Sequence, residues 1–204
     1  MKIICVGRNY VAHALELKNE VPDEPVLFMK PESAYLYYKD KFHYPKFTQD
    51  LHYECELVLK VSKTGTNLTA ENAFDYVDEI SLGIDFTARD IQTKLKAKSL
   101  PWEKAKAFDH SAIIGDFIPF TSAMKSQHLL YTLEKNEAIM QNGDTDLMIF
   151  PMRELIAAIT QYFTIEPGDL IFTGTPAGVG ASKIGDHFIG RIGTEKLFEF
   201  TIEA

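Results

Sequence analysis

The chain has 204 residues, of which 46% are hydrophobic and 25% are charged, a balance typical of globular proteins and not of disordered ones. This length suffices to bury a core, and no linker, repeat or low-complexity tract interrupts it, so we expect residues 1–204 to form a single domain. The net charge of −8 argues against nucleic acid or an anionic membrane as the partner, and no apolar run approaches the length of a membrane span.

The first part of the chain is predicted to form strands at residues 2–6, 25–30 and 35–38 and a short helix at residues 10–18. The start of the chain turns polar too early for a secretion signal, so we expect a cytoplasmic protein. Cys5 and Cys55 lie in strand-like apolar contexts. A disulfide is not excluded by the sequence, but buried free thiols in a reducing compartment fit better.

Residues 51–61 are the most informative segment. Read as a strand, the segment has an apolar face and a polar face. The apolar face carries Tyr53, Cys55, Leu57, Leu59 and Val61, and the polar face carries His52, Glu54 and Glu56. The two glutamates would stand about 6.6 Å apart and repel each other by roughly 2.5 kcal/mol at an effective dielectric near 20. A fold tolerates this repulsion by exposing both groups, by protonating one, or by placing a cation between them.

The remaining elements predict a fold in which strands dominate. We expect a helix at residues 69–76, a strand at 79–87, a polar helix at 88–98, a hairpin at 127–141, an amphipathic helix from 151 to 163, and strands at 169–173, 187–192 and 196–202. Lys94, Lys96 and Lys98 are predicted to form the solvated face of the polar helix. Because strands and helices do not alternate regularly, an α+β fold is favoured over a doubly wound α/β sheet.

Two familiar motifs are absent. The glycine-rich residues 174–180 follow a strand but lack the Gly-Lys-[Ser/Thr] ending of a phosphate-binding loop, and Pro176 interrupts a Gly-x-Gly-x-x-Gly register. The six histidines and two cysteines show no zinc-binding spacing.

Seven segments, in order along nearly the whole chain, resemble the fumarylacetoacetate hydrolase family. They are VGRNY (residues 6–10, followed by His13 and Glu16), EPVLFMKP (24–31), YECEL (53–57), DFTARDIQ (85–92), LPWEKAKAFD (100–109), QNGDTDLMIF (141–150) and GTPAGVG (174–180). The similarity is to the short single-domain branch of acylpyruvases, oxaloacetate decarboxylases and dioate isomerases. It implies an α+β domain with a mixed, rolled β-sheet, and a homodimer. The chain departs from the family after Asp109, where a Pro-Leu-Gly-Pro turn is common. The resemblance therefore does not determine the local shape of the pocket or the identity of the substrate.

The resemblance implies that Glu54, Glu56 and Asp85 are metal ligands. Three carboxylates without histidine or thiolate suit Mg²⁺ or Mn²⁺ and disfavour zinc or copper. His52 shares the strand face with the two glutamates and either supports the ligands or is a surface residue.

The same resemblance implies an enzyme acting on a small anionic 2-oxo acid, which chelates the cation so that an enolate is stabilised on the keto oxygen. The expected reaction is C–C hydrolysis of a 2,4-dioxo acid of the acylpyruvate type. The alternatives are oxaloacetate decarboxylation or keto–enol isomerisation of a dioate, and, from a different class, a non-catalytic ligand-binding metalloprotein.

Family matches also suggest roles for further residues. His13 and Glu16 would activate water as a general base, Lys106 would orient an oxyanion, and Gly7 would hinge a lid. The substrate-binding candidates are Arg8, Lys30, Arg89, Gln92 and Thr175. Without the family pattern, Arg89 and Gln92 would be read as a solvated helix face, the His13–Glu16 pair as surface residues and Thr175 as part of a turn.

Overall fold

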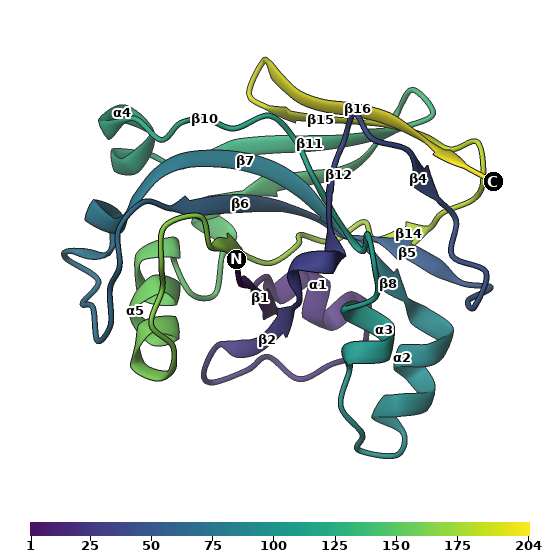
Figure 1. Ribbon diagram of the computed structural model, residues 1–204, viewed down its shortest axis with the longest axis horizontal. Coiled ribbons are helices and arrows are strands. Elements are labelled where there is room, and N and C mark those ends of the chain that lie inside the picture. Colours follow the sequence, from purple (N-terminus) through teal and green to yellow (C-terminus); the bar gives the residue numbers. More distant parts are fainter.

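An eight-stranded mixed sheet is the centre of the computed structural model, which describes residues 1–204 (Figure 1). Its strand order is β2–β1–β13–β6–β7–β9–β3, and β10 also pairs with β7. The strands are β1 (Ile3–Gly7), β2 (Val26–Lys30), β3 (Tyr35–Tyr37), β6 (Cys55–Val61), β7 (Val77–Asp85), β9 (Ala112–Ile114), β10 (Ile118–Pro119) and β13 (Leu170–Phe172). Strand β1 is parallel to β13 and β3 is parallel to β9, whereas the other pairs are antiparallel.

A second sheet of five strands lies over one face of the first, and a three-stranded sheet lies beside it (Figure 1). The second sheet has the order β12 (Ala138–Asp144), β11 (Leu130–Lys135), β15 (His187–Ile192), β16 (Glu195–Glu203) and β4 (Phe42–His43). The third sheet contains β14 (Gly180–Ala181), β5 (Leu51–Tyr53) and β8 (Thr87–Ala88).

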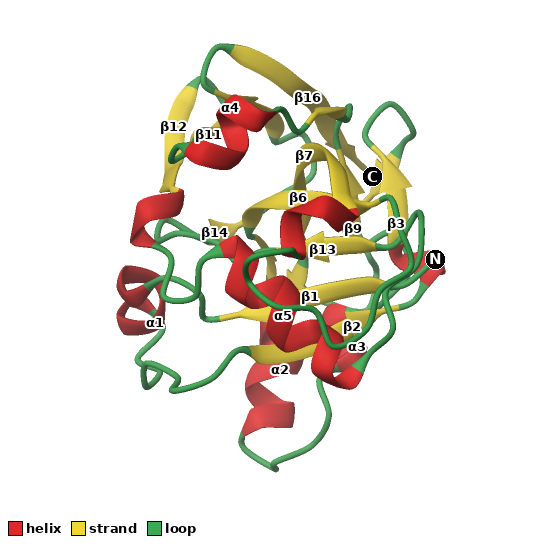
Figure 2. Cartoon of the chain, turned by 90° about the vertical axis from the view of Figure 1, so that its left-hand side faces the viewer, coloured by secondary structure: helices red, strands yellow, loops and turns green.

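The helices are short and lie at the edges of the sheets (Figure 2). They are α1 (Val11–Glu16), α2 (Arg89–Lys96), α3 (Glu103–Lys106), α4 (Ser122–Ser126) and α5 (Met152–Tyr162), with 3₁₀ turns at Glu32–Ala34, Ala73–Tyr76 and Thr145–Leu147. None of these helices combines the length and the apolar character needed to traverse a bilayer.

The main core fills the space between the two larger sheets. The predicted apolar stripe of residues 53–61 is buried there, together with inward-facing residues such as Leu82 of β7, Leu133 of β11 and Phe198 of β16. A second, smaller cluster lies on the opposite face of the eight-stranded sheet and joins side chains of β1, β6, β9 and β13. The eight-stranded sheet mixes parallel and antiparallel pairs and its strands are strongly curved (Figure 1), so the predicted α+β fold with a mixed, rolled sheet is confirmed.

The two cysteines lie in different hydrophobic clusters, on opposite faces of the eight-stranded sheet. Cys5 belongs to the smaller cluster and Cys55 to the main core, and both are buried free thiols. The sequence-based preference for free thiols over a disulfide is therefore confirmed.

Most predicted elements are present, but three predictions were wrong in detail. The expected strand at residues 51–61 is divided at Glu54 into β5 and β6, which belong to different sheets. The expected strand at residues 79–87 runs from Val77 to Asp85, and Thr87 pairs in another sheet. Of the expected helix at residues 69–76, only a 3₁₀ turn at Ala73–Tyr76 forms.

Gly83 shows how tightly the sheet curls. A Cβ at this position would lie 2.8 Å from the carbonyl oxygen of Ile113 and 2.9 Å from the ring of Phe172. Gly83→Ala should therefore destabilise the fold by about 1–3 kcal/mol, as expected for overpacking, in urea unfolding monitored by circular dichroism. Gly7→Ala is the control, since its Cβ would be 3.7 Å from the nearest atom. Equal unfolding free energies for the two variants would contradict this description of the interior.

Candidate active site

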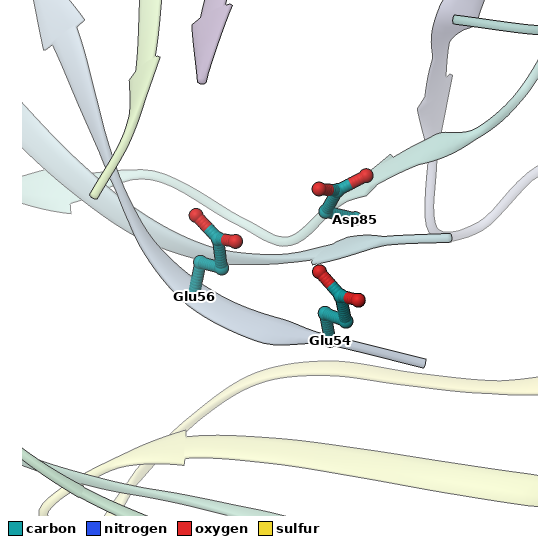
Figure 3. A group of neighbouring side chains, drawn as sticks. All are labelled: Glu54, Glu56 and Asp85. Atoms are coloured by element: carbon teal, nitrogen blue, oxygen red, sulfur yellow. The ribbon is translucent and has the colours of Figure 1, made fainter. Parts of the chain in front are cut away.

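Three carboxylates meet at one end of the curled sheet. Glu54 lies at the junction of β5 and β6, Glu56 lies in β6, and Asp85 ends β7. Their carboxylates point toward one another (Figure 3), and the nearest oxygens lie within 4.8 Å of each other. Strand pairing sets this arrangement, because the Asp85 N–H donates to the Glu54 carbonyl at 2.8 Å. The residues are only 5%, 2% and 1% exposed, so a solvated edge strand is excluded as the explanation of the Glu-x-Glu pattern.

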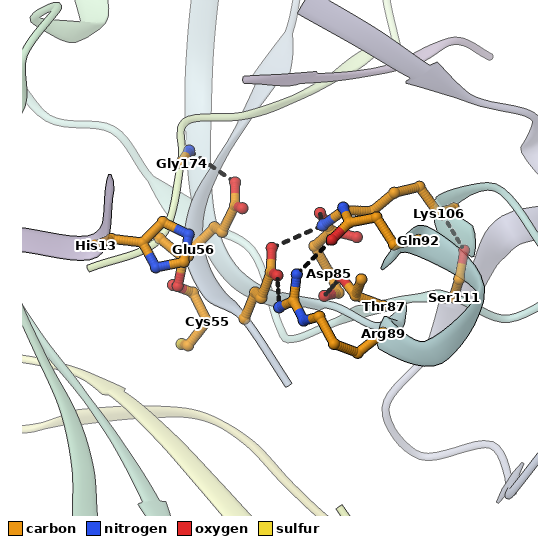
Figure 4. A network of polar contacts seen from close by, with 12 residues as sticks. His13, Cys55, Glu56, Asp85, Thr87, Arg89, Gln92, Lys106, Ser111 and Gly174 are labelled. Atoms are coloured by element: carbon orange, nitrogen blue, oxygen red, sulfur yellow. Dashed lines mark hydrogen bonds and ion pairs between the residues drawn. The ribbon is translucent and has the colours of Figure 1, made fainter. Parts of the chain in front are cut away.

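Three basic side chains offset the charge of the acids (Figure 4). Lys106 Nζ bridges two of them, at 2.7 Å from Glu54 Oε2 and 2.6 Å from Asp85 Oδ2. Arg89 Nη2 lies 2.5 Å from Glu54 Oε1, and Lys30 Nζ lies 2.7 Å from Asp85 Oδ1. Buried carboxylates require such partners, because an unpaired charge in the interior costs several kcal/mol.

The two glutamates differ in their tendency to ionise. Burial favours the neutral form of Glu54, but Lys106 and Arg89 outweigh burial and hold the pKa of this carboxyl well below its usual range. Burial and the neighbouring Asp85 raise the pKa of Glu56 well above its usual range, although the Gly174 N–H donates to Glu56 Oε2 at 2.7 Å. Burial lowers the pKa of Lys106, yet Asp85 and Glu54 raise it above its ordinary value, so its amine stays protonated.

The donor set fits a hard divalent cation. The three carboxylates are buried and their nearest oxygens lie within 4.8 Å of one another, so a divalent cation between them would relieve their mutual repulsion. Oxygen ligands without nitrogen or sulfur match Mg²⁺ and Mn²⁺.

A histidine faces these acids from the opposite wall. His13 is buried on α1, and its Nδ1 lies 3.3 Å from Glu16 Oε2. The other oxygen of Glu16 accepts the Gly178 N–H at 3.1 Å, which fixes the carboxylate and through it the imidazole. Burial lowers the pKa of His13 below its ordinary 6.5, against the opposing attraction of Glu54 and Glu16. The ring is therefore neutral at pH 7 and leaves Nε2 free to accept a proton.

Asn9 holds helix α1 in this position. Its fully buried side chain donates to the carbonyls of Thr173 and Phe150 at 2.8 and 3.0 Å and accepts the Phe150 N–H at 2.9 Å. This residue belongs to the 6–10 segment but was not singled out from the sequence.

The acids and the histidine share one cavity of about 420 Å³, its open mouth included. Of the other residues with sequence-predicted roles, the cavity brings together Gly7, Arg8, Arg89, Gln92, Lys106 and Thr175. Lys30 and Glu16 are not in its wall, and they contact Asp85 and His13 from behind. His52 is also outside the cavity, with Nε2 at 2.9 Å from Asp50 Oδ1.

Two residues in the wall have contacts that the sequence did not predict. Gln92 is buried, and its Oε1 accepts from Arg89 Nη1 at 2.6 Å, so these residues are not a solvated helix face. The Thr175 hydroxyl donates to the Cys55 carbonyl at 2.8 Å and accepts from Gln141 Nε2 at 2.8 Å. The hydroxyl of Thr175 is therefore occupied within the protein, whereas its main-chain N–H has no partner.

Gln141 is a supporting residue that sequence reasoning missed. It is 1% exposed on β12, and its Oε1 accepts the Cys55 N–H at 2.9 Å. Together with Thr175 it binds both main-chain polar groups of Cys55, the residue between the two glutamates, which explains why the strand breaks there. The only sequence signal was its place at the start of the 141–150 segment.

Lys96 was assigned wrongly. The sequence placed it with Lys94 and Lys98 on a solvated face, but Lys96 lines the cavity and its Nζ lies 5.5 Å from the centre of the Trp102 ring. Lys94 and Lys98 are exposed as expected. Residue 96 turns inward because it follows Arg89 and Gln92 by seven and four positions on the same helical face.

Comparison with known proteins places this arrangement among enzymes. Residues 2–197 match the family model described as fumarylacetoacetate hydrolase C-terminal. The chain is 42% identical to the mitochondrial oxaloacetate decarboxylase of Dictyostelium discoideum, over 98% of this chain and 93% of the relative. It is 40% identical to the mitochondrial oxaloacetate tautomerase FAHD1 of Homo sapiens, over 98% and 91%. The solved structure of fumarylpyruvate hydrolase from Pseudomonas aeruginosa in complex with Mn²⁺ and pyruvate superposes with a TM-score of 0.92 at 35% identity, covering 100% of this chain and 89% of that one.

Gln141→Leu tests the support of the Glu54–Cys55–Glu56 segment. The change keeps a similar volume but leaves the buried Cys55 N–H without an acceptor, which should cost about 1–3 kcal/mol of unfolding free energy. Loss of a residue that orients ligands typically weakens metal binding by about 10–100-fold, and we expect this loss for Mn²⁺ measured by electron paramagnetic resonance. Gln161→Leu on the exposed side of α5 is the matched control. Unchanged Mn²⁺ affinity in Gln141→Leu would show that the hydrogen bond from the Cys55 N–H to Gln141 does not support the acids.

Proposed function

Because this chain belongs to the fumarylacetoacetate hydrolase family, we propose that it is a Mg²⁺- or Mn²⁺-dependent enzyme that catalyses proton transfer next to the keto group of small anionic 2-oxo acids. The observation that carries the proposal is the presence of three buried carboxylates and a histidine oriented by Glu16 around one cavity. A non-catalytic ligand-binding role is not retained, since the relatives are named enzymes.

Glu54, Glu56 and Asp85 would hold the divalent cation. When bound, the cation supplies Lewis acidity to a chelating 2-oxo carboxylate and so favours negative charge on the keto oxygen. The crystal structure of the Pseudomonas aeruginosa relative contains Mn²⁺ and supports this cofactor class, with Mg²⁺ the other candidate.

The other residues around the cavity would act as the base and as substrate-binding groups. His13 Nε2 would accept the proton from the carbon next to the keto group or from a water molecule, with Glu16 fixing the ring through Nδ1. Lys106 and Arg89 lie beside the acids and would orient the developing oxyanion and the carboxylate of the substrate. Gln92 and the free N–H of Thr175 would add hydrogen bonds, and Lys30 would act from behind Asp85.

Oxaloacetate is the first substrate to test. The relatives from Dictyostelium discoideum and Homo sapiens are named for oxaloacetate decarboxylation and tautomerisation. Both reactions develop negative charge on the keto oxygen, and tautomerisation also needs a base. C–C hydrolysis of acylpyruvates, the reaction expected from the sequence, is the second candidate. The His13–Glu16 pair, which can activate water, and the similarity to a fumarylpyruvate hydrolase favour it. The homodimer, the cytoplasmic location and the lid role of Gly7 stay predictions.

The metal requirement is tested on a panel of oxaloacetate and acylpyruvates. Chelation should abolish turnover and Mg²⁺ or Mn²⁺ should restore it. Glu56→Gln should weaken Mn²⁺ binding by more than about 100-fold, beyond the effect of a merely supporting residue, as measured by calorimetry. Glu195→Gln, at an exposed position of β16, should bind Mn²⁺ like the parent. Full activity of metal-stripped protein would end the proposal.

Replacement of His13 distinguishes decarboxylation from the two reactions that need a base, hydrolysis and tautomerisation. His13→Ala should lower acylpyruvate hydrolysis by about 10²–10⁴-fold, as expected for a lost general base, and tautomerisation by a similar factor, whereas decarboxylation, which needs no proton acceptor, should fall less. His128→Ala on an exposed loop is the control and should leave all rates unchanged. Parental rates of hydrolysis and tautomerisation in His13→Ala would remove the residue from the mechanism.

The pH profile follows from the lowered pKa of His13. Since burial lowers the pKa of His13 from its ordinary 6.5, the fall of kcat/KM on the acid side, where the ring becomes protonated, should have its midpoint below pH 6.5. A kinetic pKa above 6.5 on this limb would show that another group is the base.

A further inference from the structure

Two basic side chains in the cavity have no partner in the protein. Arg8 and Lys96 both line the wall, and neither side chain forms a hydrogen bond or an ion pair with another residue, whereas Lys106 and Arg89 are paired with the acids. The acid site therefore does not account for these two positive charges, which are left for something that enters the cavity.

The fold keeps this pair together at a cost. Lys96 is half-buried, and burial followed by repulsion from Arg8 and Arg89 lowers its pKa. Arg8 has a φ of +60°, a left-handed conformation that is strained for a non-glycine residue and tends to persist at functional sites. Like charges held close in a partly desolvated wall are stabilised by an anion placed between them.

Helix α2 sets the distance of this pair from the acids. Arg89, Gln92 and Lys96 stand at positions i, i+3 and i+7, so all three face the cavity along one stripe. Arg89 contacts Glu54, and Lys96 lies about 10.5 Å farther along the helix axis at 1.5 Å per residue. An anion bound at Lys96 would therefore lie in the same cavity as the acids, at another part of its wall.

We propose that Arg8 and Lys96 bind a second carboxylate of the substrate, so that the enzyme selects 2-oxo dicarboxylates over 2-oxo monocarboxylates with an uncharged tail. This inference rests on the proposed function, because it takes the 2-oxo end to lie at Glu54, Glu56 and Asp85. The Trp102 ring, against which Lys96 packs, keeps the ammonium directed along the cavity wall.

The test uses two ligands that differ in the distal group, 2-oxoglutarate and 2-oxobutyrate, titrated calorimetrically into Mn²⁺-loaded protein. The parent should bind the dicarboxylate at least about tenfold more tightly, the scale of one charge-assisted hydrogen bond. Lys96→Met keeps the apolar stem on Trp102 but removes the charge, and should abolish this preference while leaving 2-oxobutyrate affinity unchanged. Lys96→Arg should retain the preference, as should Lys94→Met on the exposed face of the same helix.

The outcomes separate this inference from the proposed function. If the parent binds both ligands equally, or if Lys96→Met weakens both by the same factor, the second-carboxylate site is overturned while the 2-oxo acid function stands. If the parent binds neither ligand and turns over no 2-oxo acid, the proposed function fails and this inference fails with it. In steady-state kinetics the inference requires Lys96→Met to raise KM for a dicarboxylate with little change in kcat. A lower kcat with an unchanged KM would contradict it.

Discussion

The burial of three carboxylates at one end of a curled sheet is the constraint on which the rest of this structure depends. Such a cluster is unfavourable unless positive charge is supplied within a few ångströms, because the interior cannot screen the repulsion as water does. The chain meets this requirement with Lys106, Arg89 and Lys30, which come from three separate segments.

Placing the acids requires support from segments remote in sequence. Gln141 and Thr175 bind the main chain between the two glutamates, and the Gly174 N–H binds Glu56 directly. Gly174 has a φ of +99°, and a Cβ there would lie 2.5 Å from the Cβ of Asn9, so no other residue fits without displacing helix α1. The turn that holds the acids and the helix that carries His13 are therefore one packed unit (Figure 4).

Under the proposed function, the acids, the histidine and the paired cations would stabilise charge on a 2-oxo acid and move one proton. Which reaction follows would then depend on whether water reaches the bound substrate and on what the rest of the cavity wall binds. In this chain the cavity wall carries two unpaired basic residues, Arg8 and Lys96, and such a wall suits a charged group better than an alkyl chain.

The sequence by itself determined the features that depend on local periodicity. The alternation of polar and apolar residues placed Glu54 and Glu56 on the face opposite the apolar stripe, and the spacing of apolar residues predicted helix α5. The ordered family segments singled out the acids, His13 and Lys106 as candidates. The sequence did not determine what distant contacts impose. The break at Glu54 exists because Gln141 and Thr175 bind the main chain of Cys55. The spacing of Lys96 from Arg89 and Gln92 puts all three on one face of α2, but only tertiary packing decides that this face, and not the face of Lys94, meets Trp102 and the cavity, because the sequence does not record which face a neighbouring segment covers.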